Sequence, residues 1–81
     1  MMRRYLVVVE KGESNYGAYI PDLPGCVALG DTVEETLALM KEALAAHLEG
    51  MVEDDDPIPE PTSIGEYVDV DLPEPAVRKF A

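Results

Sequence analysis

The longest periodic stretch of the chain, from Thr32 to Glu53, restricts the possible folds more than any other feature. Apolar side chains recur there at spacings of three and four, which places them on one stripe of a helix: Val33, Leu37, Met40, Leu44, Leu48 and Met51. Thr32 and Glu35 have the spacing of a capping box, in which the threonine side chain bonds the Glu35 amide and the Glu35 side chain reaches back. A helix with one apolar face needs another layer to cover that face.

The rest of the chain supplies strands for this layer. Short β-branched and aromatic runs predict strands at Tyr5–Glu10, Tyr16–Ile20 and Cys26–Leu29, the first two joined as a hairpin. Residues 67–72 alternate in polarity, which predicts a fourth strand with Val68, Val70 and Leu72 facing inward. We therefore expect an α+β fold of order βββαβ, a four-stranded sheet with one long helix packed on it.

The length of 81 residues fits one domain, which we place at residues 1–73, followed by a C-terminal tail at 74–81. A domain of this size buries only about 60–65% of the surface that its unfolded chain exposes. Its single cysteine, Cys26, excludes an internal disulfide. Small domains often gain stability by oligomerising, and edge strands favour self-pairing, so we expect a homodimer or larger assembly.

The net charge of −11 limits the kinds of partner that the chain can bind. Phosphate backbones and anionic membrane surfaces repel such a protein, so we expect no direct nucleic-acid binding and no membrane binding. An acidic surface suits a basic protein partner, although acidity also serves solubility alone. The lone cysteine and the absence of a long apolar segment predict a cytoplasmic protein.

No catalytic constellation is evident in the sequence. His47 has no serine or cysteine at a spacing that would make it a general base, and Cys26 lies in an apolar run without a basic neighbour. The expected roles are a boundary histidine on the helix and a small buried hydrophobe. We expect no enzyme activity and no cofactor.

Carboxylates offer the one alternative with metal chemistry. Those on different elements could meet around two metal ions, as in metal-dependent nucleases: Glu10, Glu34, Glu35, Glu42, Asp69 and Asp71. The glutamates of the helix lie off its apolar stripe, and the aspartates of the fourth strand alternate with its inward residues. Both groups therefore point away from the core, which disfavours a shared metal site. The run Glu53–Asp56 lacks the spaced ligands and the glycine of a calcium loop, which favours a solvated charge run.

Residues 16–35 resemble the HicB antitoxin family of type II toxin–antitoxin systems. The segment contains a Gly-Ala-Tyr second strand, then Pro-Asp-Leu-Pro-Gly-Cys, a short strand, Gly-Asp-Thr and a Glu-Glu pair that opens the helix. Pro57 and Pro59 resemble the proline region that follows the helix in that family. The similarity covers residues 5 to about 72.

This resemblance implies a partial ribonuclease-H-like fold that has lost its nuclease residues, and assembly as a dimer or tetramer. It also implies a partner, a HicA-type toxin, which is a small basic ribonuclease that cleaves mRNA and is neutralised when the antitoxin covers it. Many family members add a C-terminal DNA-binding domain. Beyond Glu74 only residues 75–81 remain to form the helices of such a domain, so we expect a short form without it. The alternative is a solitary regulatory or scaffold oligomer without a toxin.

Two segments are the candidates for partner binding. Two prolines stiffen the first, and Gly25 follows it at a point where the turn favours a glycine conformation: Pro21, Asp22, Leu23 and Pro24. We expect it to form a rigid, exposed loop. The second is the acidic run at the end of the helix: Glu53, Asp54, Asp55 and Asp56.

Overall fold

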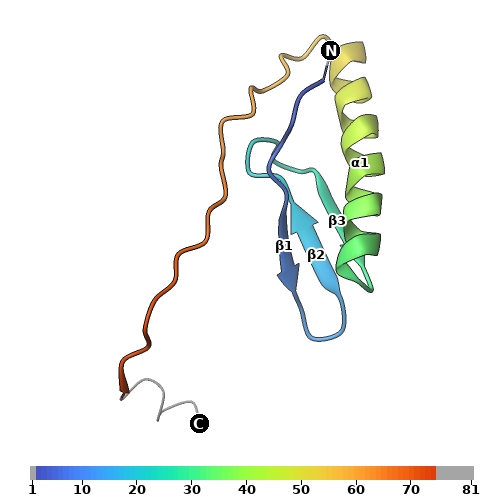
Figure 1. Cartoon of the computed structure of the whole chain (residues 1–81). Coiled ribbons are helices and arrows are strands. Elements are labelled where there is room, and N and C mark those ends of the chain that lie inside the picture. Colours follow the sequence, from blue (N-terminus) through green and yellow to red (C-terminus); the bar gives the residue numbers. More distant parts are fainter. Residues whose placement is uncertain (1, 75–81) are drawn as a thin grey trace.

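The computed structural model describes residues 2–74, which form a three-stranded sheet with one helix across it (Figure 1). The strands are β1 (Val8–Lys11), β2 (Tyr16–Tyr19) and β3 (Val27–Gly30), antiparallel and in the order β1-β2-β3. The helix, α1, spans Val33–Glu53. The predicted α+β class and the element order as far as the helix are confirmed. Of the predicted tail at 74–81, only Glu74 lies within the described residues.

The register of the sheet assigns its side chains to two faces. Ala18 of β2 is opposite Ala28, while Tyr19 is opposite Val27. Residues directly opposite one another share a face, and neighbours along a strand alternate. Ala18 is buried beneath α1, so Tyr19 and Val27 point to the other face, which no described element covers.

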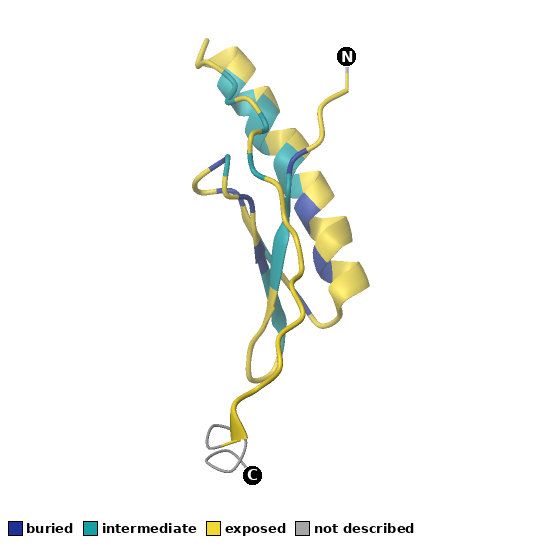
Figure 2. Ribbon diagram, turned by 60° about the vertical axis from the view of Figure 1, so that its left-hand side comes forward, coloured by how far each residue is buried: buried dark blue, intermediate teal, exposed yellow. Residues whose placement is uncertain are grey.

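The core lies between α1 and the sheet, and the β2–β3 loop closes it (Figure 2). Ile20, Leu23 and Met40 are its most deeply buried apolar side chains. Tyr5, from the extended segment before β1, completes it beside Ala18 and Cys26. The thiol of Cys26 lies 3.8 Å from the sulfur of Met40.

The first turn of α1 is capped much as the sequence predicts. The Glu35 amide donates to Thr32 Oγ1 at 3.0 Å, which satisfies one of the free amides of the helix start. The second hydrogen bond of the capping box differs from the prediction. The Glu35 carboxylate accepts a hydrogen bond from the amide of Asp31 at 3.3 Å, not from the amide of Thr32.

The inward face of α1 begins at Thr36, which corrects the predicted stripe. Val33 and Leu37 are exposed, whereas Thr36 is fully buried against Gly30. The Thr36 hydroxyl donates to the carbonyl of Thr32 at 2.6 Å, so the buried oxygen has a partner. Because Gly30 has no side chain and Thr36 is small, the end of β3 and the start of α1 can approach each other closely. A larger apolar side chain at position 36 would prevent this approach.

The C-terminal end of α1 is a Schellman motif formed by acidic residues. Asp55 has a left-handed backbone with φ of 55°, the Asp56 amide donates to the Met51 carbonyl at 2.8 Å, and the Asp55 amide donates to the Val52 carbonyl at 3.1 Å. Glycine usually occupies the left-handed position because it has no Cβ. The aspartate there adopts a conformation that costs free energy.

The predicted fourth strand is not formed in this structure. Residues 67–72 are extended but are bonded to no strand among the described residues. We call residues 66–72 the arm. It projects beyond the sheet and contributes to a longest dimension of 54 Å (Figures 1 and 2). Alternating polarity predicted its extended backbone, but a strand also needs an edge to pair with, and none lies directly beside the arm.

Candidate protein-interaction surfaces

The Pro21–Pro24 loop joins β2 to β3, and its four residues have different environments. Pro21 and Pro24 are exposed, but Leu23 is one of the most buried side chains of the protein. The expectation that the whole loop is exposed is therefore wrong for Leu23, which closes the core. Gly25 has φ of 89°, the left-handed conformation that its place in the turn predicts.

Asp22 fastens the segment after the helix to this loop. Its carboxylate accepts the amides of Thr62 and Ser63 at 3.0 and 2.9 Å, and both of their hydroxyls at 3.2 and 2.9 Å. The bond from the Ser63 amide is the main reason that the pKa of Asp22 lies below its ordinary value. We call this contact the Asp22 clamp. It spans some 40 residues of chain, and no local pattern in the sequence indicates it.

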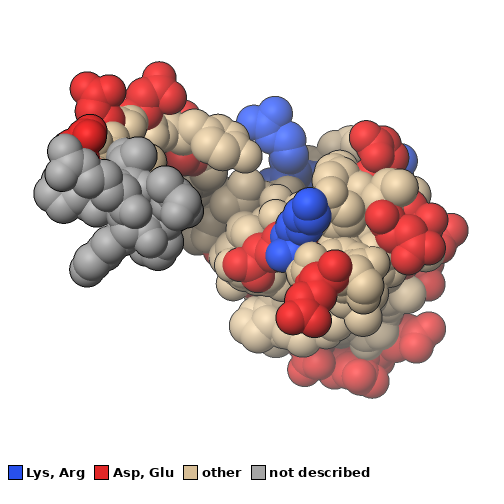
Figure 3. Space-filling view, turned by 90° about the horizontal axis from the view of Figure 1, so that it is seen from below, with Lys and Arg blue, Asp and Glu red and all other residues tan. Residues whose placement is uncertain are grey.

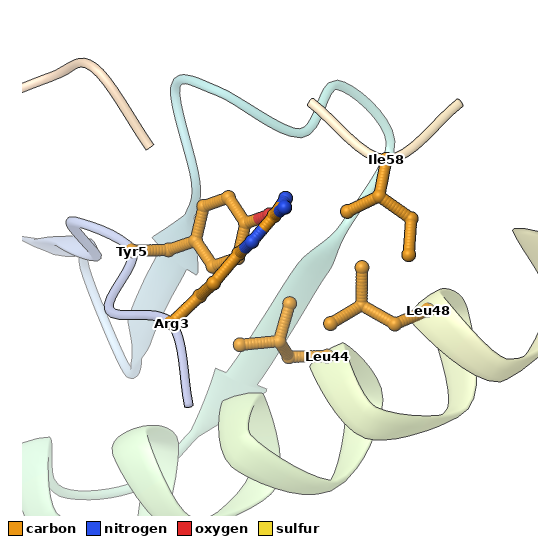
Figure 4. A pocket seen from close by; sticks show the side chains of 5 residues that line it. All are labelled: Arg3, Tyr5, Leu44, Leu48 and Ile58. Atoms are coloured by element: carbon orange, nitrogen blue, oxygen red, sulfur yellow. The ribbon is translucent and has the colours of Figure 1, made fainter. Parts of the chain in front are cut away.

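A second contact ties the same segment to the start of the chain. Tyr5 donates its hydroxyl to the Pro59 carbonyl at 2.6 Å, and Arg3 lies 3.4 Å from Glu60. Arg3 and Tyr5 also line an apolar pocket of about 290 Å³. On its other side, Leu44 and Leu48 of α1 point toward Ile58 (Figure 4). The prolines that follow the helix therefore return the chain to the body of the domain.

The acidic run Glu53–Asp56 is fully exposed around the end of α1. Its Schellman turn wraps the carboxylates about the last turn of the helix, where the helix dipole also disfavours negative charge. In Figure 1 the acidic run lies at the far end of α1, whereas the Pro21–Pro24 loop lies level with the middle of the helix. The two predicted partner-binding segments are therefore at different levels along α1.

Negative charge also extends over the face that Figure 3 shows. Seen from below, acidic side chains outnumber basic ones across the visible face (Figure 3). The four basic side chains of residues 2–74 are Arg3, Arg4, Lys11 and Lys41; the two arginines precede β1 and Lys11 is its last residue. Among the described residues, the segment leading into β1 is therefore the most basic.

Within residues 2–74, no three histidine, cysteine or carboxylate side chains are grouped so that they could hold a metal ion. The alternative constellation is dispersed, and all of its carboxylates are exposed: Glu10, Glu34, Glu35, Glu42, Asp69 and Asp71. His47 is half-buried on α1. Burial raises the pKa of the Cys26 thiol, which disfavours the thiolate, the reactive form of cysteine.

The described part of the chain includes no helix that is both long and apolar enough to cross a membrane. Exposed large apolar side chains occur on the uncovered face of the sheet and on the arm, as well as at Met2, Val52 and Ile64. We call Tyr19, Val27 and Leu29 the open-face patch.

Comparison with known proteins gives the family. Residues 5–77 match the family model described as HicB_like antitoxin of bacterial toxin-antitoxin system. The chain belongs to the HicB-like antitoxin family. It is 41% identical over 71 residues to Antitoxin HicB 1 of Photorhabdus laumondii, covering 85% of this chain and 46% of that one. It is also 41% identical over 64 residues to an uncharacterized 14.9 kDa protein of Haemophilus phage HP1, covering 79% of this chain and 48% of that protein.

The fold of this HicB-like chain also has a solved counterpart. A chain of a HicA3 and HicB3 toxin–antitoxin complex superimposes with a TM-score of 0.64 and 28% identity, over 74% of this chain and 70% of that chain. The predicted membership of a toxin–antitoxin family is confirmed, whereas the ribonuclease-H-like assignment stays a prediction. The chain spans about half the length of the curated relatives described above.

Proposed function

We propose that this HicB-like chain is a non-catalytic module that binds and neutralises a small, basic, mRNA-cleaving toxin of the HicA type. The observation that carries the proposal is the family match over residues 5–77, which includes every element of the described domain. Similarity to a chain of a toxin–antitoxin complex supports the same role.

The charge of the chain supports a basic partner. With a net charge of −11, its surface attracts a basic protein over a range of about 8–10 Å at ordinary salt and repels nucleic acid. A toxin that binds RNA needs a basic surface for its substrate, so an acidic antitoxin competes for that surface. In this proposal the antitoxin blocks the toxin by occupying its RNA-binding face.

The acidic run Glu53–Asp56 and the exposed prolines Pro21 and Pro24 form the proposed contact surface. Both segments are held in place by backbone hydrogen bonds. The Schellman turn holds the acidic run, while bonds from Leu23 to Ile20 and from Cys26 to Leu23 hold the loop. A rigid acidic surface loses little conformational entropy on binding.

The test is binding and rescue with a HicA-type toxin. Coexpression of the chain should restore growth of cells that the toxin arrests, and purified chain should bind the toxin with an affinity that falls as salt rises. Replacing all four residues of the acidic run by their amides should weaken binding by at least about tenfold, because fully desolvated charge pairs dominate such interfaces.

A matched control removes the same number of charges elsewhere, through Glu10→Gln, Glu13→Gln, Glu34→Gln and Glu42→Gln. It should retain most of the affinity if the acidic run is the contact. Equal losses in both variants would show that only overall charge matters. No binding to any HicA-type toxin, together with no rescue, would reject the proposal in favour of a solitary oligomer.

Absence of catalysis is part of the same proposal. We expect no cleavage of RNA or DNA by the pure chain with magnesium or manganese, because hydrolysis needs convergent groups with complementary protonation roles. Metal-dependent cleavage that disappears in Glu10→Gln or Asp69→Asn would instead establish the carboxylate nuclease. Cleavage that survives both substitutions would indicate a contaminating nuclease.

A further inference from the structure

The sheet and the segment after the helix each offer backbone without a strand partner. The first offers the outer edges of β1 and β3, which the order β1-β2-β3 leaves open among residues 2–74, and of these the edge of β1 is on the side of the arm (Figure 1). The second offers the arm, whose side chains are almost wholly exposed, from 103% for Tyr67 to 68% for Leu72. An apolar row left in water and an open sheet edge each favour addition of another strand.

A groove lies where the segment that enters β1 runs beside the segment that leads into the arm. It has a volume of about 480 Å³ and is lined on one side by Arg4–Val7 and on the other by Pro61, Ser63, Ile64 and Gly65. The Asp22 clamp holds one wall in place. Near the other end of that wall, Gly65 is so close to Leu6 that a Cβ on the glycine would lie 3.1 Å from Leu6 Cδ1.

We propose that this groove receives the arm of a second copy of the chain, which adds as a strand along the edge of β1. Each copy supplies one groove and one arm, so the exchange is reciprocal and closes as a two-fold dimer. The fourth strand that the sequence predicts would then be formed between copies and not within one.

The direction of the arm makes the added strand antiparallel. The chain through residues 61–72 runs in the same direction as the segment that enters β1, from the end of α1 toward the β1–β2 turn (Figure 1). A two-fold axis perpendicular to the sheet reverses the direction of the partner's arm. The inserted strand would therefore continue the antiparallel pattern of β1, β2 and β3.

Charge favours the same arrangement. In the antiparallel orientation, the C-terminal half of the inserted arm lies at the N-terminal end of the groove. This half carries Asp69 and Asp71, and that end of the groove carries Arg4, with Arg3 beside it. Most of the acidic surface repels a second copy, but the groove has the basic residues to attract the arm.

The first test is the oligomeric state of the full chain without any toxin, so its outcome does not depend on the proposed function. Sedimentation equilibrium at micromolar concentration should give a dimer. Val68→Asp with Val70→Asp, which places charges on the apolar row of the arm, should raise the dimer dissociation constant by at least about tenfold. The matched control, Val27→Asp with Leu29→Asp on the open-face patch, should leave the dimer intact.

The second test reverses charges on the two proposed partners. Asp71→Arg lowers the net negative charge, so general repulsion predicts a tighter dimer, whereas local pairing with Arg4 predicts a weaker one. Arg4→Glu should also weaken the dimer, and the two substitutions in one chain should restore it. Hydrogen exchange should show slow amides at residues 66–72 only in the dimer.

Several outcomes would overturn the proposal. A wild-type chain that remains a monomer excludes the exchange, and slow exchange of the arm in a monomer shows that it folds onto its own β1. A dimer that is insensitive to the arm substitutions but lost in the open-face control uses the other face of the sheet. Pairing of the two arms alone would make the dimer insensitive to Arg4→Glu.

Discussion

Gly30 and Thr36 approach so closely that a Cβ on the glycine would lie 2.6 Å from the threonine hydroxyl and 2.9 Å from the Thr36 backbone nitrogen. The contact joins the end of β3 to the first turn of α1. Gly30→Ala should therefore destabilise the fold by about 1–3 kcal/mol, because a backbone atom cannot move aside as a side chain can. Chemical denaturation would measure it.

Gly50→Ala is the matched control for that substitution. No atom lies within 4 Å of the position that its Cβ would take, and the residue is inside α1. The change should stabilise the protein by up to about 1 kcal/mol, since alanine has the higher helix propensity. If both variants had the same stability, the close contact of Gly30 would have no energetic consequence.

The hydrogen bond from Tyr5 to the Pro59 carbonyl gives a second prediction. Tyr5→Phe keeps the ring in the core but removes the donor, and should lower the free energy of unfolding by about 1 kcal/mol. Tyr67→Phe on the arm is a suitable comparison because its side chain is fully exposed. Equal stability of the two variants at low concentration would contradict a structural role for the bond.

The Asp22 clamp should weaken in acid. The pKa of Asp22 is depressed in the folded state, chiefly by the bond from the Ser63 amide, so folding favours the charged form. The stabilisation is therefore complete above the ordinary aspartate pKa of about 3.9 and is lost as pH falls through the lower folded value. Amide exchange at Thr62 and Ser63 would report it.

Asp22→Asn tests the source of that pH dependence. The amide nitrogen cannot accept a hydrogen bond, so residues 62 and 63 should exchange faster than in the parent at neutral pH. The difference between the two proteins should shrink below the folded pKa. If the difference in amide exchange between the parent and Asp22→Asn were the same at every pH, the faster exchange would result from the shape of the side chain and not from its charge.

The left-handed conformation of Asp55 is the basis for a stabilising substitution. Asp55→Gly should raise the free energy of unfolding by up to about 1 kcal/mol, because glycine adopts this conformation without a Cβ penalty and the change removes a charge that the helix dipole disfavours. Thermal denaturation would measure the gain. Asp54→Gly, at the neighbouring cap position with φ of −86°, removes the same charge without relieving a left-handed backbone, so it should gain less than Asp55→Gly.

Cys26 should resist thiol reagents in the folded protein. The side chain is buried and its pKa is raised by desolvation, so both access and thiolate fraction are low. Alkylation should be slow under native conditions and fast in denaturant. Rapid alkylation of the native chain would mean that the core opens at Cys26 far more often than its packing indicates.

Sequence patterns predicted what depends on neighbours along the chain. The capping residues Thr32 and Glu35, the helix end at Glu53 and the left-handed Gly25 were all identified from local spacing. The periodicity of α1 failed near its start, where Val33 and Leu37 are exposed and Thr36 faces inward because Gly30 leaves room for it. That preference depends on contact with another element, which an apolar stripe does not reveal.

The candidate surfaces were predictable to a smaller extent. The acidic run is exposed as its composition indicates, but Leu23 lies in the core because the loop turns inward. The role of Asp22 depends on Thr62 and Ser63, about 40 residues away, and hydrogen bonds of this range leave no periodic signal. The alternation of residues 67–72 indicated an extended backbone without specifying which strand, if any, would pair with it.

The Asp22 clamp also determines how the domain would respond to a mechanical load. The carboxylate joins residues 62 and 63 to the β2–β3 loop, whereas α1 ends at Glu53, nine residues before the clamp. A pull on the described C-terminal end would therefore reach the loop between the strands before it reached the helix. Four hydrogen bonds to one side chain would bear this tension first, and the contacts of Glu60 and Pro59 with Arg3 and Tyr5 would bear it next, before it reached the last turn of α1.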